Sequence, residues 1–248
     1  HYVSDAQRAT ITVLSVPSTF DLDRFRDLVS TFHTGVPATA EGLATLREFS
    51  FVEEVAPRRY ALHGLVREAL AERDARDPDR ATERERIHRH LLAQAQAVLE
   101  CIDVKAVTEA DERALREATE HQRALLLVEE WVDWYWEAEK PFHRAARWSA
   151  LEPLETDVLV QVERALGPDH SDTLQSVNNL GYLLYARGDL AGAEPLFRRA
   201  RVGREAALGP DHRDTLQSVN NLAALLDSKG DLAGAEPLYR RALAGREA

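Results

Sequence analysis

The sequence predicts a mainly α-helical protein with two parts: a small N-terminal domain of three helices and a β-hairpin, followed by a stack of helical pairs. Two observations predict this fold. Thirty residues starting at Gly167 recur 42 residues later at Gly209 with six differences, and a fixed period of this length indicates a repeat fold. The first eighty residues lack that period and instead combine helix caps with two short β-type runs. Hydrophobic residues at 44% and charged residues at 29% are typical of a globular chain.

The N-terminal region, residues 1–76, has helix start signals before each apolar stretch. Ser4 with Gln7 forms a capping box, Asp21 opens a second helix, and Thr39 or Ala40 opens a third. Two β-type runs follow at 51–55 and 59–62, and a final helix begins at His63. Three helices and a hairpin describe a winged helix. The charged stretch 74–89 predicts a hinge and the exposed start of a helical connector over 77–124.

The repeats, residues 167–208 and 209–248, each predict two amphipathic helices. In the first copy, apolar residues at three- and four-residue spacing predict helices over 172–187 and 190–208. Gly188 ends the first helix, and the GPDH sequence closes the unit. A blurred earlier copy covers 125–166. Its four tryptophans, at 131, 134, 136 and 148, predict a hydrophobic seam towards the preceding domain, with a ligand-binding box as the alternative.

The spacing of small and large residues in both copies resembles the tetratricopeptide repeat. The matching positions in the first copy are Leu180, Gly181, Leu184, Gly188, Ala193, Phe197 and Ala200, and in the second Leu222, Ala223, Leu226, Gly230, Ala235, Tyr239 and Ala242. The 42-residue length looks like the variety found in kinesin light chains and bacterial regulators. The resemblance implies a right-handed α-solenoid whose first helices line a partner-binding groove.

In that family, the groove positions fall on Gln175, Asn178, Tyr182, Tyr185 and Ala186, with Gln217, Asn220, Ala224, Asp227 and Ser228 as their counterparts. Three of these five pairs differ while nearly all packing positions are kept, which is expected of a binding surface on a repeated frame. Ordinary drift at solvated positions is the alternative. The Asn178 and Asn220 amides are expected to clamp the backbone of a peptide, and Asn179 and Asn221 to bond between repeats.

The stretch YALHGLVREALAER resembles the end of the winged-helix domain in signal-transduction ATPases of the NB-ARC type (STAND proteins). Leu62-His63-Gly64 occupies the place of their Met-His-Asp motif. The resemblance implies that His63 senses the β-phosphate of ADP held by an upstream domain. Gly64 stands where the motif has aspartate, so the locking of the resting state by ADP is altered or lost. A histidine that only caps the helix is the alternative reading.

Several chemistries have no support in the sequence. No phosphate-binding loop, GxSxG elbow or HExxH motif occurs, so we predict no catalytic residue, no enzyme activity and no cofactor in this chain. ADP or ATP would belong to the full-length protein. His88 and His90 point apart on a helix, and we predict no metal site. A net charge of −11 and mixed charges on the third helix and hairpin argue against nucleic acid.

The location and extent of the chain are also predicted. No apolar run is long enough to span a membrane, and no secretory leader is visible. The single cysteine, Cys101, excludes an internal disulfide and predicts a core position in a cytoplasmic protein. Because the chain has no methionine and starts at His1, we expect an excised piece of a longer protein.

The sequence therefore favours the regulatory and sensor region of a multidomain signalling ATPase. Its expected partners are a protein or peptide ligand in the groove and an upstream NTPase domain, with homo-oligomer formation on activation left open. A stand-alone protein–protein interaction adaptor is the alternative, and a winged-helix DNA-binding regulator is the third reading.

Overall fold

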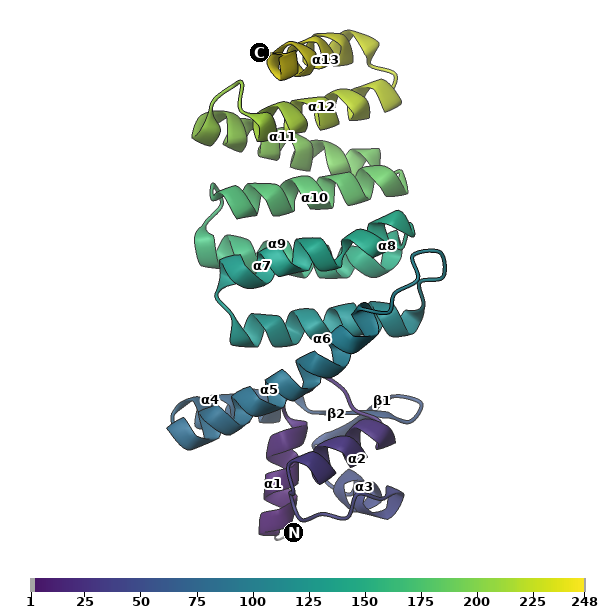
Figure 1. Ribbon diagram of the computed structural model, residues 1–248, viewed down its shortest axis with the longest axis vertical. Helices are drawn as coiled ribbons and strands as arrows, with labels where there is room; N and C mark the ends of the chain where they lie inside the picture. The colour runs from purple at the N-terminus through teal and green to yellow at the C-terminus, as the bar shows by residue number, and fades with distance from the viewer. Residues whose placement is uncertain (1–2, 248) are drawn as a thin grey trace. The chain divides into compact units, whose positions relative to one another are not determined.

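The computed structural model describes residues 3–247, with side chains to Gly245, and shows a largely helical chain (Figure 1). The chain forms two compact units, which are described separately. The first unit runs up to Val98 and includes residues 117–125. The second unit contains residues 99–116 and the chain from Leu126 onwards.

The first unit contains the helices and hairpin predicted at the N-terminus. Ser4 and Gln7 form the predicted capping box, and the Asp21 and Thr39 side chains accept hydrogen bonds from the first turns of the next two helices. The predicted helix starts are therefore confirmed. The elements are α1 (Asp5–Leu14), α2 (Leu22–Thr31), α3 (Ala40–Arg47), β1 (Val52–Ala56), β2 (Arg59–Leu62), α4 (Gly64–Ala75) and α5 (Pro78–Leu99).

The hairpin is a two-stranded antiparallel sheet in which Val52 pairs with Leu62. Arg58, at the turn, has a φ of 60°, in the left-handed region. Phe20 adds an isolated bridge to β2, since its N–H and carbonyl both bond to Tyr60 at 2.8 Å. Phe20 also belongs to the core that α1 to α3, β2 and α5 share. The hairpin is thus anchored to the helices by backbone bonds as well as by apolar contacts.

The second half of α6 (Glu109–Leu125) belongs to the first unit and joins it through polar pairs. Arg24 donates to Glu117 at 2.9 Å, and Arg67 donates to Glu120 at 3.2 Å. Both pairs are largely shielded from solvent, so they are less screened than surface pairs. The helices α5 and α6 fill the range predicted as a connector, and the predicted domain boundaries stay predictions.

Two positions in these helices differ from the sequence prediction. Asp74, predicted in a hinge, lies in the last turn of α4 and is only 1% exposed, because Arg73 and Arg84 surround its carboxylate. Cys101, predicted in the core, is exposed in the turn after α5. The helical pattern that suggested burial ends at Leu99, two residues earlier.

In the second unit, helices stack in the order of the sequence (Figure 1). Neighbouring helices in this stack pack on one another from α9 onwards. The predicted helices over 172–187 and 190–208 are confirmed to within one residue. The elements are α7 (Val128–Ala138), α8 (Lys140–Arg144), α9 (Trp148–Leu166), α10 (Ser171–Arg187), α11 (Leu190–Leu208), α12 (Arg213–Ser228) and α13 (Leu232–Glu247).

The degenerate copy holds the tryptophans inside the second unit. Trp131 is 2% exposed and packs with Val158 and Val162 of α9, with Trp134 and Trp136 beside it. These rings therefore fill the space between α7 and α9. In this copy α7 ends at Ala138, and the short helix α8 follows from Lys140.

Close helix packing in the first repeat depends on Gly181. A Cβ at this position would lie 2.9 Å from two ring atoms of Phe197, which is fully buried. The second copy has Ala223 and Tyr239 at these two positions, and Tyr239 is 36% exposed. Gly188 ends α10 with a φ of 92°, which glycine adopts without strain.

Candidate functional site

The first helices of the two repeats, α10 and α12, start with the same hydrogen bonds. Thr173 donates its hydroxyl to the Gly167 carbonyl at 2.7 Å, and Thr215 donates to Gly209 at 2.9 Å. Both threonines are fully buried. Because the two helices begin identically, differences in their surface chemistry come from the residues that differ in sequence.

Four of the predicted groove residues lie at the surface of these helices. Tyr182 is 47% exposed, Asp227 is exposed, and Tyr185 and Ala224 are half-buried. The Tyr185 hydroxyl lies 3.0 Å from the Ser228 hydroxyl of the next repeat. The predicted positions thus form a surface that continues from one repeat to the next.

Tyr239 of α13 extends this surface. Burial raises its pKa, and the neighbouring Asp227 carboxylate and Tyr185 raise it further. We call Tyr182, Tyr185, Asp227, Ser228 and Tyr239 the tyrosine surface. Phenol rings supply apolar area together with a hydrogen-bonding hydroxyl, and Asp227 adds a negative charge. This combination suits a peptide that carries apolar and basic side chains.

Asn178, which was predicted to clamp a peptide, is instead buried and bonded within the protein. This residue is 2% exposed, and its Oδ1 accepts from Asn221 Nδ2 at 3.0 Å and from the Ser218 hydroxyl at 3.4 Å. The reason is its angular position on α10, which turns the amide towards α12. Asn221 makes the predicted bond between repeats, whereas Asn179 accepts from Gln175 within α10 at 2.7 Å.

The side chain of Gln175 is hydrogen-bonded to a buried residue that the sequence analysis missed, Arg204. Arg204 of α11 is 2% exposed and donates to Gln175 Oε1, to the Ser218 hydroxyl at 2.9 Å and to the Asp214 carbonyl at 3.0 Å. Burial lowers the pKa of Arg204. A signal was present, since Arg204 continues the four-residue spacing of the buried Ala200.

The remaining groove candidates and His63 lie towards solvent. Gln217 is exposed and Asn220 half-buried on α12. His63 is exposed at the start of α4, where its Nδ1 accepts from the Leu65 N–H at 3.4 Å and its Nε2 lies 4.0 Å from Glu53. The side chain thus caps the helix weakly and directs its second ring nitrogen towards the hairpin.

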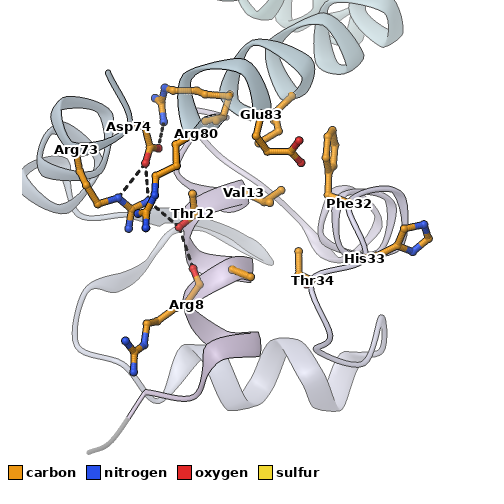
Figure 2. A pocket seen from close by; sticks show the side chains of 14 residues that line it. Arg8, Thr12, Val13, Phe32, His33, Thr34, Arg73, Asp74, Arg80 and Glu83 are labelled. Carbon is orange, nitrogen blue, oxygen red and sulfur yellow. Dashed lines mark hydrogen bonds and ion pairs between the residues drawn. The ribbon is translucent and has the colours of Figure 1, made fainter. Parts of the chain in front are cut away.

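The first unit also contains a cavity of about 340 Å³ between α1, α4 and α5 (Figure 2). Arg73 donates to Asp74 at 2.6 Å and to the Thr12 hydroxyl at 3.1 Å. Arg84 donates to the Ser15 hydroxyl at 3.2 Å. Arg73 and Arg84, the latter at 3.7 Å, neutralise the buried Asp74, and their bonds to Thr12 and Ser15 attach α4 and α5 to α1. The cavity wall therefore serves the packing of these helices.

One group of metal-ligating side chains comes together within the described residues, in the second unit: Glu139, His143 and Glu155. Burial alone would lower the pKa of His143, but its close contacts with the Glu139 and Glu155 carboxylates raise it to about 9. The sequence analysis missed this group because its members come from three separate elements. His88 and His90 do point apart, since His88 contacts His121 and His90 contacts Asp27.

Comparisons with known proteins bear on the C-terminal part. A family model described as tetratricopeptide repeat matches residues 172–248. No curated protein matches the chain. A solved structure titled "Crystal structure of BtubC (BKLC) from P. vanneervenii" is 17% identical, with 98% of this chain and 90% of that chain covered. Its TM-score is 0.41, which is too low to support an inference.

The tetratricopeptide match over residues 172–248 covers nearly all of the two repeats predicted at 167–208 and 209–248, and such repeats present surfaces for protein partners. None of the helices in the described part of the chain is long and apolar enough to cross a bilayer.

Proposed function

We propose that the repeats bind a peptide segment of a protein partner through the tyrosine surface. The main observation that supports this proposal is where the two copies differ in sequence. Tyr182 and Tyr185 stand where the second copy has Ala224 and Asp227, at surface positions of helices that are identical at most of their other positions. Tyrosine is enriched among the residues that dominate binding energy, and Asp227 would attract a basic residue of the peptide.

The buried amides define which residues do not contact the partner. Asn178 is bonded to Asn221 of the next repeat, and Gln175 is bonded to Arg204 of its own repeat, so both side chains are used in packing. The proposed contact surface is therefore narrower than the groove predicted from the sequence. Its energy would come from the aromatic rings and not from a clamp of asparagines.

A displayed peptide library and a fluorescence titration test this proposal. The double variant Tyr182→Ala/Tyr185→Ala is expected to bind the selected peptide with at least about tenfold lower affinity. The matched control is Val160→Ala/Val202→Ala, which removes apolar side chains that are each 55% exposed on α9 and α11. Circular dichroism checks that both variants are folded. Equal affinity of the two variants would reject the tyrosine surface.

We further propose that the chain is the regulatory region of a longer signalling ATPase, with residues 1–76 acting as a winged-helix domain. The order of three helices, hairpin and helix supports this proposal, as does the position of His63 at the start of α4. With Nδ1 facing the Leu65 N–H, the Nε2–H is the group that would donate to a phosphate. Partner binding would then shift the nucleotide switch by favouring one of its conformations.

The test uses the full-length product of the gene, because this proposal requires a nucleotide-binding domain ahead of residue 1. His63→Ala is expected to weaken ADP binding by about tenfold and to leave affinity for the selected peptide unchanged. The control variant Glu68→Ala changes an exposed residue of the same helix. The adaptor alternative would be favoured if the preceding sequence contained no phosphate-binding loop or if His63→Ala left the ADP affinity unaltered.

A further inference from the structure

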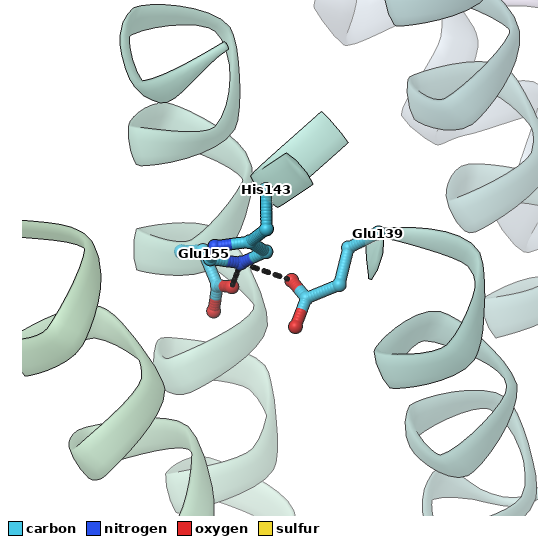
Figure 3. A group of neighbouring side chains, drawn as sticks. All are labelled: Glu139, His143 and Glu155. Carbon is cyan, nitrogen blue, oxygen red and sulfur yellow. Dashed lines mark ion pairs between the residues drawn. The ribbon is translucent and has the colours of Figure 1, made fainter. Parts of the chain in front are cut away.

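The cluster of Glu139, His143 and Glu155 joins three consecutive elements of the second unit (Figure 3). Glu139 lies between α7 and α8, His143 lies one turn later in α8, and Glu155 projects from α9. The imidazole Nε2 lies 3.6 Å from Glu139 Oε2 and 3.5 Å from Glu155 Oε1. The cluster therefore brings two carboxylates and one imidazole to a common point.

Both carboxylates are buried and only partly satisfied. Glu155 is 0% exposed, and neither of its carboxylate oxygens has a hydrogen-bond partner. Glu139 is 4% exposed, and its Oε2 also lacks a partner. Burying an uncompensated carboxylate is expensive, so a buried charge is normally paired or bound to a metal. Here Glu139 Oε2 and Glu155 Oε1 face the same imidazole nitrogen at ion-pair distance, and Glu155 Oε2 has no partner at all (Figure 3).

The separations match a shared ion better than direct hydrogen bonds. A charge-assisted N–H···O bond is about 2.7–2.9 Å long, which is shorter than either contact of His143. Two ligands that are each about 2.1 Å from one tetrahedral ion lie about 3.4 Å apart. The observed 3.5 and 3.6 Å are close to that value, and all three ligand atoms lie within 4.8 Å of one another.

The donor set indicates the kind of ion. Imidazole nitrogen with carboxylate oxygens is typical of Zn²⁺ and related divalent transition metals, whereas Ca²⁺ and Mg²⁺ prefer oxygen ligands alone. A divalent ion would balance the charges of both carboxylates. We propose that Glu139, His143 and Glu155 bind one divalent transition-metal ion of the Zn²⁺ type, which ties α7 and α8 to α9.

The site adjoins the tyrosine surface. The His143 ring lies 5.4 Å from the Trp148 ring and 6.2 Å from the Tyr182 ring, centroid to centroid. An ion that fixes His143 would thereby also restrict the aromatic neighbours on which a partner would dock. This structural role does not depend on peptide binding, so the metal site and the proposed function can fail separately.

Zinc binding is measured on the full chain after treatment with a chelator and dialysis. Isothermal titration calorimetry is expected to give one Zn²⁺ per chain, and zinc is expected to raise the melting temperature. Glu155→Gln and His143→Gln should each weaken Zn²⁺ binding by at least about tenfold. The matched control His170→Gln changes a histidine that caps α10 outside the cluster.

X-ray absorption at the zinc edge of the wild-type chain provides a readout that does not require the variants to fold. The expected shell contains one imidazole nitrogen and otherwise oxygen ligands. A shell with sulfur or with two or more imidazoles would overturn the assignment. So would a folded wild-type chain that binds no Zn²⁺, Co²⁺ or Mn²⁺, because the buried carboxylates would then be satisfied by protons alone.

Discussion

Two buried histidines in the first unit should make its stability depend on pH. His88 of α5 and His121 of α6 are 8% and 1% exposed, and their Nδ1 atoms lie 3.1 Å apart. One ring donates and the other accepts, which two neutral tautomers can do. Burial and the charge of Arg84 lower the pKa of His88 to about 4. Burial, followed by the charges of His88, Arg24 and Arg67, lowers the pKa of His121 to about 3.

The direction of this pH dependence follows from the number of protons that the folded and unfolded states bind. Unfolded histidine has a pKa of about 6.5, so at pH 5 the unfolded chain holds protons that the folded pair does not. Stability from this pair is therefore complete above about pH 6.5 and decreases as the pH falls towards the folded pKa values of about 4 and 3. Between pH 7 and pH 5 the free energy of unfolding should fall by about 2 kcal/mol per histidine, or about 4 kcal/mol for the pair.

Urea unfolding followed by circular dichroism at pH 7 and pH 5 measures this loss. The variant His88→Gln/His121→Gln keeps polar side chains that do not titrate, so its stability should decrease about 4 kcal/mol less than that of the wild type. His33→Asn is the control, because His33 is exposed and asparagine tolerates its φ of 48°. An equal pH dependence of the double variant and the wild type would refute the argument.

Three further substitutions test the packing of the repeats by urea unfolding. Arg204→Met should destabilise by about 2–4 kcal/mol, because it removes a buried charge that organises two repeats; a loss no larger than that of the exposed Arg240→Met would contradict this role. Phe197→Ala should cost about 3–5 kcal/mol, clearly more than Tyr239→Ala at the half-exposed equivalent position. Gly188→Ala should cost about 1 kcal/mol through its positive φ, since a Cβ there meets nothing within 4 Å, and an unchanged midpoint would count against backbone strain.

The helices of the repeats were predictable because their signals are local. Gly188 and Gly209 end helices through their own backbone conformations, and the apolar spacing between them identifies the buried face. The capping box at Ser4 is equally local. In the degenerate copy these signals are weaker, and the break between α7 and α8 was therefore missed.

The candidate sites were less predictable because they depend on the angle between elements. Asn178 and Asn179 are adjacent in sequence, yet only Asn178 turns towards the next repeat. Arg204 is buried because Gln175 and Ser218, from two different helices, converge on it. The spacing within α11 indicates that Arg204 faces inwards, but it does not identify the residues that Arg204 contacts, since these depend on how the helices pack.

The comparison of the two copies separates residues for packing from residues for recognition. Positions that are identical in both copies include the buried Thr173, which bonds to the start of its own repeat, and the buried Asn178, which bonds to the next repeat. Positions that differ include Tyr182 and Tyr185, which reach the surface. Gln175 is also identical to its counterpart Gln217, and a packing contact accounts for this, because Arg204 binds the Gln175 side chain.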